Sequence, residues 1–113
     1  MQLSVRLTIP DPRPEDAGSL IRVAVVDTSQ ADALHPTVAE VTVRLENSSR
    51  SVDVTLDVPD AALEGHRYSL QAHVDRHGTG EIKSGDLIIT ENIPVAASRT
   101  PGASHISASL TRV

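Results

Sequence analysis

The sequence contains no cysteine, phenylalanine or tryptophan, and Tyr68 is its single tyrosine. Without cysteine, the chain can form no disulfide bond, no thiolate metal site and no cysteine nucleophile. One tyrosine leaves almost no surface on which nucleic-acid bases could stack. The 10 Lys and Arg residues are outnumbered by 15 Asp and Glu residues, which gives a formal net charge of -5. A basic surface for phosphates is therefore missing, and we expect no nucleic-acid partner.

Long apolar runs and an export signal are also missing from the sequence. No run of apolar residues approaches the roughly 20 that a membrane helix needs, so we expect no membrane span. The first residues lack the basic and apolar regions of a signal peptide. We therefore expect a cytoplasmic location for the chain as given, or a periplasmic or envelope-associated location if an N-terminal segment is removed. The length of 113 residues fits a single domain over 1–113.

Valine, isoleucine and threonine are abundant, numbering 13, 7 and 9, and they favour β-structure. Apolar residues recur at every second position in several windows, as in half-buried strands. The clearest window is Val52 to Val58, whereas Leu20 to Asp27 is apolar on both faces and predicts a central strand. The predicted strands cover residues 3–9, 20–27, 37–45, 52–58, 67–75, 81–90 and 104–112.

Turn residues separate these windows. Three prolines between residues 10 and 14 end the first window, and residues 59–65 could form one helical turn that ends at a glycine. Gly85, inside the sixth window, indicates a bulge or a close backbone approach. Short strands at this spacing predict an all-β fold: an antiparallel two-sheet β-sandwich of about seven strands, immunoglobulin-like or transthyretin-like.

Residues that could perform chemistry do not form a recognisable motif. Five histidines are scattered along the chain, and only His73 shares a strand face with an acidic residue, Asp75. The spacing typical of metal ligands is missing, so we expect no metal site. Asp53 and Asp57 are interpreted as the solvated face of a strand rather than an acid/base pair. Because neither a nucleophile elbow nor a phosphate loop occurs, we predict a non-enzymatic protein without cofactors.

Two features predict structural roles. Tyr68 opens a strand just after a turn, a placement that resembles the tyrosine corner of sandwich folds, in which the hydroxyl bonds back to the chain upstream. The loop after residue 26 contains Asp27, Ser29 and Asp32, whose side chains can bond to nearby backbone amides and stiffen a turn. A binding role for Tyr68 or for the loop is the less favoured interpretation.

Several segments occur in a recognisable order and spacing. The most distinctive is the strand at 21–26 followed by Asp27-Thr28-Ser29-Gln30-Ala31-Asp32-Ala33. The other segments are 5–10, 54–59, 66–72, 88–90, 94–95 and 106–113. Together they resemble the YscW/YbaY-like lipoprotein family, which includes the pilotins, the lipoprotein chaperones of type III secretion. The resemblance extends over nearly the whole chain.

The resemblance implies a small, non-catalytic β-sandwich. Secretion-linked members of that family bind a secretin subunit and escort it to the outer membrane, but this chain lacks the cysteine that carries the lipid in anchored members. We therefore expect a protein-interaction module, with a protein partner that could add a strand to an exposed sheet edge. The alternatives are a structural or assembly domain, including a homodimer through an edge strand, and a carrier of a small ligand between the sheets.

Overall fold

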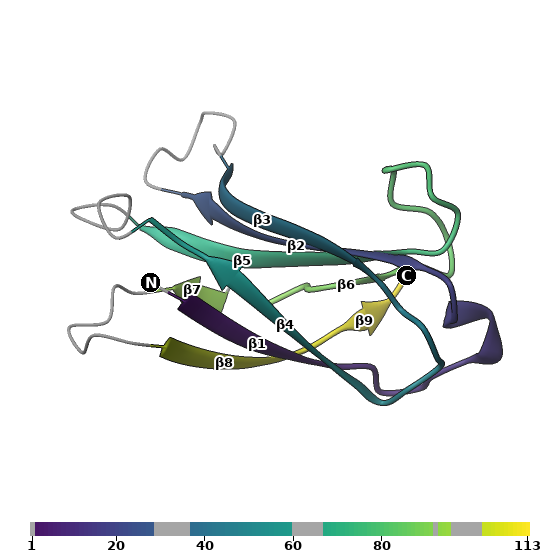
Figure 1. Cartoon of the computed structure of the whole chain (residues 1–113). Coiled ribbons are helices and arrows are strands. Elements are labelled where there is room, and N and C mark those ends of the chain that lie inside the picture. Colours follow the sequence, from purple (N-terminus) through teal and green to yellow (C-terminus); the bar gives the residue numbers. More distant parts are fainter. Residues whose placement is uncertain (1, 29–36, 60–66, 92, 96–102) are drawn as a thin grey trace.

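The protein is an all-β sandwich in a computed structural model that describes residues 2–28, 37–59, 67–91, 93–95 and 103–113 (Figure 1). One 3-10 turn, η1, covers Pro14–Asp16. The strands of the described residues are β1 Gln2–Thr8, β2 Leu20–Asp27, β3 Thr37–Arg44, β4 Ser51–Asp57, β5 Tyr68–Asp75, β6 Leu87–Ile88, β7 Ile93–Val95, β8 Ala103–Ser109 and β9 Thr111–Arg112.

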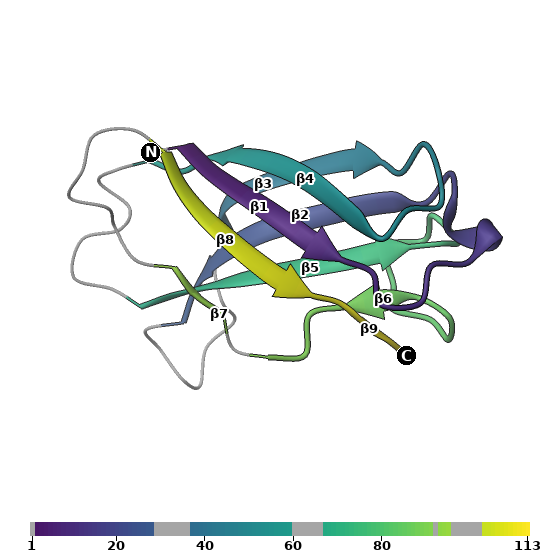
Figure 2. The same ribbon diagram turned by 90° about the horizontal axis from the view of Figure 1, so that it is seen from below.

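The strands form two sheets that pack face to face. The smaller sheet has the order β4-β1-β8, and the larger has the order β3-β2-β5-β6-β9, with β7 also pairing with β5. The last strands pass from one sheet to the other at Leu110, which is buried between β8 and β9 (Figure 2). The predicted all-β sandwich is confirmed.

Aliphatic side chains from both sheets fill the space between them. Every second residue of β1 is buried, namely Leu3, Val5 and Leu7, as period-two patterning predicts. Strand β2 is central, between β3 and β5, and buries Ala24 and Val26 on its outer face as well as the side chains that face the core. The expectation that this strand is covered on both faces is confirmed for its second half.

One strand pair departs from the antiparallel expectation. Strands β1 and β8 run parallel, with Val5 paired with Ile106, whereas β1 and β4 are antiparallel. A hairpin forces its two strands to be antiparallel, but β1 and β8 are the first and eighth strands and share no hairpin. Local turn signals therefore do not determine their relative direction.

The strand predicted over 81–90 is wrong in its extent. Only Leu87 and Ile88 form a strand there, and the preceding residues form turns that end at the buried Asp86. Strand β7 forms where no strand was predicted, and the predicted last strand is divided into β8 and β9. The predicted helical turn over 59–65 falls on residues that, Pro59 apart, lie outside the described ranges.

Candidate functional site

The residues predicted for a tyrosine corner and a stiff loop are only partly described. Tyr68 is buried at the start of β5 and pairs with Asp27 at the end of β2. The pKa of the Tyr68 phenol is raised, mainly by burial and to a smaller extent by the nearby charge of Asp27. The backbone N–H of Thr28 donates to the Arg67 carbonyl at 2.8 Å, which ties the same two strand ends together. The corner remains a prediction.

Ser29 and Asp32 lie outside the described residues, so the rest of the predicted loop is not placed.

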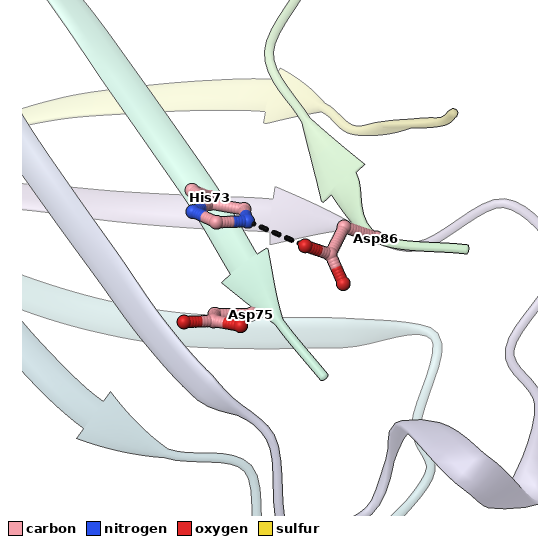
Figure 3. A group of neighbouring side chains, drawn as sticks. All are labelled: His73, Asp75 and Asp86. Carbon is pink, nitrogen blue, oxygen red and sulfur yellow. Dashed lines mark hydrogen bonds and ion pairs between the residues drawn. The ribbon is translucent and has the colours of Figure 1, made fainter. Parts of the chain in front are cut away.

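A different polar cluster occupies the other end of β5. His73, Asp75 and Asp86 present ligand-type atoms that all lie within 4.8 Å of one another on the outer side of the larger sheet (Figure 3). Sequence periodicity placed His73 and Asp75 on one face. It missed Asp86, whose only signal is an acidic residue directly before the apolar residues 87–89.

Asp75 shapes the turn that follows β5. Its Oδ1 accepts hydrogen bonds from the backbone N–H groups of His77 at 3.1 Å and Gly78 at 2.8 Å, and its Oδ2 accepts one from Gly80 at 2.7 Å. The Gly80 bond is the largest influence on the pKa of Asp75, which is lowered although burial opposes the change. The carboxylate therefore holds the turn in place.

Asp86 joins two turns to β5. It is fully buried and accepts hydrogen bonds from His73 Nε2–H at 2.8 Å, from the Arg76 backbone N–H at 3.0 Å and from the Lys83 backbone N–H at 3.1 Å. Burial acts to raise the pKa of Asp86, but these hydrogen bonds, led by that of His73, outweigh it and the pKa is lowered.

The same hydrogen bonds weigh against a metal ion in this cluster. Every carboxylate oxygen of Asp75 and Asp86 already accepts at least one hydrogen bond, and His73 Nε2 is bonded to Asp86. A metal ion would have to displace the His73–Asp86 hydrogen bond. It would also have to compete with the N–H groups that already donate to the carboxylate oxygens. The arrangement is suited to holding the β5–β6 connection.

A second buried carboxylate ties the chain end to the first turn. Arg112 donates two hydrogen bonds to Asp16, at 3.0 and 2.9 Å, one to the Gly85 carbonyl at 2.8 Å and one to the Asp11 carbonyl at 2.9 Å. Burial acts to raise the pKa of Asp16, yet the bonds from Arg112 and from the Arg13 backbone outweigh it and lower the pKa. Sequence reasoning missed this pair because 96 positions separate its members.

Sheet edges are the remaining candidates for a functional surface, and they differ in charge. Strand β3 carries Glu40 and Arg44, and β4 carries Asp53 and Asp57. Strand β8 borders the smaller sheet with the sequence Ala-Ser-His-Ile-Ser-Ala-Ser, in which no Lys, Arg, Asp, Glu or Pro occurs. Charged residues and prolines are the usual protection of an edge against pairing, so β8 is less protected than β3 or β4.

One comparison with known proteins, that with solved structures, supports the fold. No family model matches the chain, and no curated protein matches its sequence. Among solved structures, the chain is similar to an alternative pilotin from the type II secretion system of Vibrio cholerae, with a TM-score of 0.77 and 17% sequence identity. The match covers 100% of this chain and 96% of that chain. Within its described ranges, this chain contains no helix with the length and hydropathy needed to cross a membrane. At this sequence identity, the similarity establishes the fold.

Proposed function

We propose that this protein is a non-enzymatic, pilotin-like module that binds a segment of a protein partner. The observation that carries the proposal is the structural similarity to a secretion-system pilotin over the full length of this chain. The sequence resemblance to the YscW/YbaY-like family supports it independently, because that family includes pilotins. The resemblance names the class of partner, the secretin subunit of a secretion system.

The polar clusters fit this proposal better than they fit catalysis. A carboxylate that acts as a general acid or base must be free to exchange a proton with a substrate. The carboxylates of Asp16, Asp75 and Asp86 are instead held by backbone amides and arginine or histidine side chains. The similarity to a pilotin also favours association with the cell envelope over the cytoplasmic location expected from the first residues.

One observation favours the alternative of an assembly domain. The unprotected edge of β8 could pair with the β8 strand of a second copy, since Ile106 is the central residue of the strand and would lie opposite itself. This homodimer predicts a mass of twice 12.0 kDa in sedimentation equilibrium, whereas the pilotin-like proposal requires only a binding surface on one chain.

The direct test uses the secretins encoded in the same genome. Overlapping segments that cover each secretin, prepared as purified fusion proteins, are titrated into this protein, and binding is followed by calorimetry. We expect one segment to bind with a dissociation constant in the micromolar range or tighter, about -8 kcal/mol. If no secretin segment binds, the pilotin-like function is wrong.

A further inference from the structure

The smaller sheet is narrower than the sheet it covers. At the end of the sandwich where β7 lies, the larger sheet has four strands side by side, β3, β2, β5 and β7, against three in the smaller sheet. Figure 2 shows β8 at the border of the smaller sheet, with β7 lying beyond it. Among the described residues, nothing pairs with the outer edge of β8.

The outer edge of β8 offers backbone hydrogen-bonding groups. The N–H of Leu110 donates to the carbonyl of Thr8 at 2.9 Å, so this N–H is directed toward β1. Backbone groups of successive residues in a strand point to opposite edges, so those of His105, Ser107 and Ser109 point away from β1. These residues supply donors and acceptors for one further strand.

Apolar side chains lie on the inner side of the same border. Ile106 of β8 and Ile93 of β7 pack against the core but remain partly exposed, as does Ile89 after β6. Between residues 105 and 109 of β8, the outward-facing residues are histidine and serine. A strand beside β8 would therefore meet apolar side chains on one face and polar, uncharged ones on the other.

We propose that the outer edge of β8 binds an extended segment of the partner as a fourth strand of the smaller sheet. This inference rests on the proposed partner-binding function and names its surface. Main-chain hydrogen bonds to residues 105, 107 and 109 supply the affinity, and alternate apolar side chains of the segment cover Ile93 and Ile106. The absence of charge on β8 selects a segment whose facing side chains are uncharged.

The proposal is tested with a synthetic peptide that needs no knowledge of the partner. The probe is Thr-Val-Thr-Val-Thr-Val-Thr with a lysine at each end, and the control peptide has the same residues with the valines in one block. Backbone amide resonances of the whole protein are followed during titration. We expect the shifts to be largest at His105, Ser107 and Ser109, and the alternating peptide to bind more tightly than the block peptide.

A pair of proline variants tests the edge itself. Ser107→Pro removes an outward N–H but leaves the β1 ladder intact, which an edge strand tolerates. Thr55→Pro is the matched control on β4, because the bond from Ile9 N–H to the Arg50 carbonyl directs the Thr55 N–H away from β1. We expect Ser107→Pro to raise the dissociation constant of the alternating peptide at least tenfold and Thr55→Pro to leave it unchanged.

Several outcomes would overturn the edge proposal: no binding, shifts centred elsewhere, or equal effects of the two prolines. Shift mapping on the unsubstituted protein decides the matter even if Ser107→Pro unfolds. A dimer that already protects the amides of β8 would identify a second copy as the occupant and contradict a partner segment.

If a secretin segment binds Ser107→Pro as well as it binds the parent, the proposed function stands and this surface is wrong. If the peptide binds at β8 but no secretin segment binds, the surface is confirmed and the proposed function is wrong.

Discussion

At the residue scale, the structure gives part of the acidic surplus a structural use. Asp16 and Asp86 are fully buried in a protein whose core is mostly aliphatic, and Asp75 is nearly so. Buried carboxylates are costly unless hydrogen bonds compensate them, and here backbone amides and basic side chains do so. These residues fix turns that the aliphatic core alone does not specify.

Asp86→Asn tests this role at the best-connected carboxylate. The amide nitrogen of Asn carries donors where Asp86 has an acceptor oxygen. Depending on which oxygen it replaces, either the Arg76 N–H or both the His73 and Lys83 N–H groups lose their acceptor. A buried group left without a partner costs about 1–3 kcal/mol, and we expect the free energy of unfolding in urea to fall by that amount. An unchanged urea midpoint would contradict the structural role of Asp86.

The matched control is Asp53→Asn. Asp53 also accepts a hydrogen bond from a basic side chain, Arg6 at 2.9 Å, but both partners of this pair are largely exposed. Exposed ion pairs add little to stability because solvent screens them. The same chemical change should therefore leave the urea midpoint of the protein unchanged.

At the scale of elements, period-two patterning predicted the long strands well. The predicted range 20–27 coincides with β2, and β1, β3, β4 and β5 each agree with their predicted ranges to within one or two residues. These strands bury alternate side chains, and burial of one face is what fixes the pattern in the sequence. Local information was sufficient wherever a strand is long and faces the core.

The short elements could not be predicted because their cause is not local. The sequence over 81–90 contains apolar residues that suggest a strand, yet hydrogen bonds from His73 and Arg76 hold Asp86 in a turn. The division at Leu110 depends on the two sheets being packed together. The same holds for the polar clusters, since the pairing of Asp16 with Arg112 exists only in the folded chain.

Gly85→Ala tests the turn that replaces the predicted strand. Gly85 has a φ of +94°, and an added Cβ would collide with Nη1 of Arg76, which donates to the Gly85 carbonyl. Gly78→Ala is the control, with a φ of +68° and open space around the added carbon. We expect Gly78→Ala to cost about 1–2 kcal/mol from backbone strain alone.

Gly85→Ala should cost more than Gly78→Ala, because the strain is joined by the displaced guanidinium of Arg76. Urea denaturation of the two variants measures the difference directly. Equal losses of stability would show that the contact between Gly85 and Arg76 does not constrain the turn.

At the scale of the whole molecule, the two buried clusters form one network. Arg76 contributes its backbone N–H to Asp86 and approaches Asp16 with its Nε at 3.8 Å, while Arg112 bonds to both Asp16 and the Gly85 carbonyl. The network thus joins the first turn η1, the β5–β6 connection and the C-terminal strand β9. We therefore expect that disrupting this network lowers the stability of the entire sandwich.

The dependence of stability on pH follows from this network. The pKa values of Asp16, Asp75 and Asp86 are lowered in the folded protein, whereas an unfolded Asp titrates near 3.9. Above about pH 5 these groups are ionised in both states and their stabilisation is complete. Below about pH 4 the unfolded chain binds protons first, so the stabilisation is lost as the pH falls through the folded pKa values.

We therefore expect the urea midpoint to be constant from about pH 7 to 5 and to fall steeply between about pH 4 and 3. Asp86→Asn removes one of the three carboxylates, so its midpoint should fall less steeply over the same interval, although it starts lower. Asp53→Asn should follow the parent closely, because Asp53 is exposed and stands apart from the network. Parallel curves for the parent and Asp86→Asn would show that acid unfolding begins elsewhere than at the buried carboxylates.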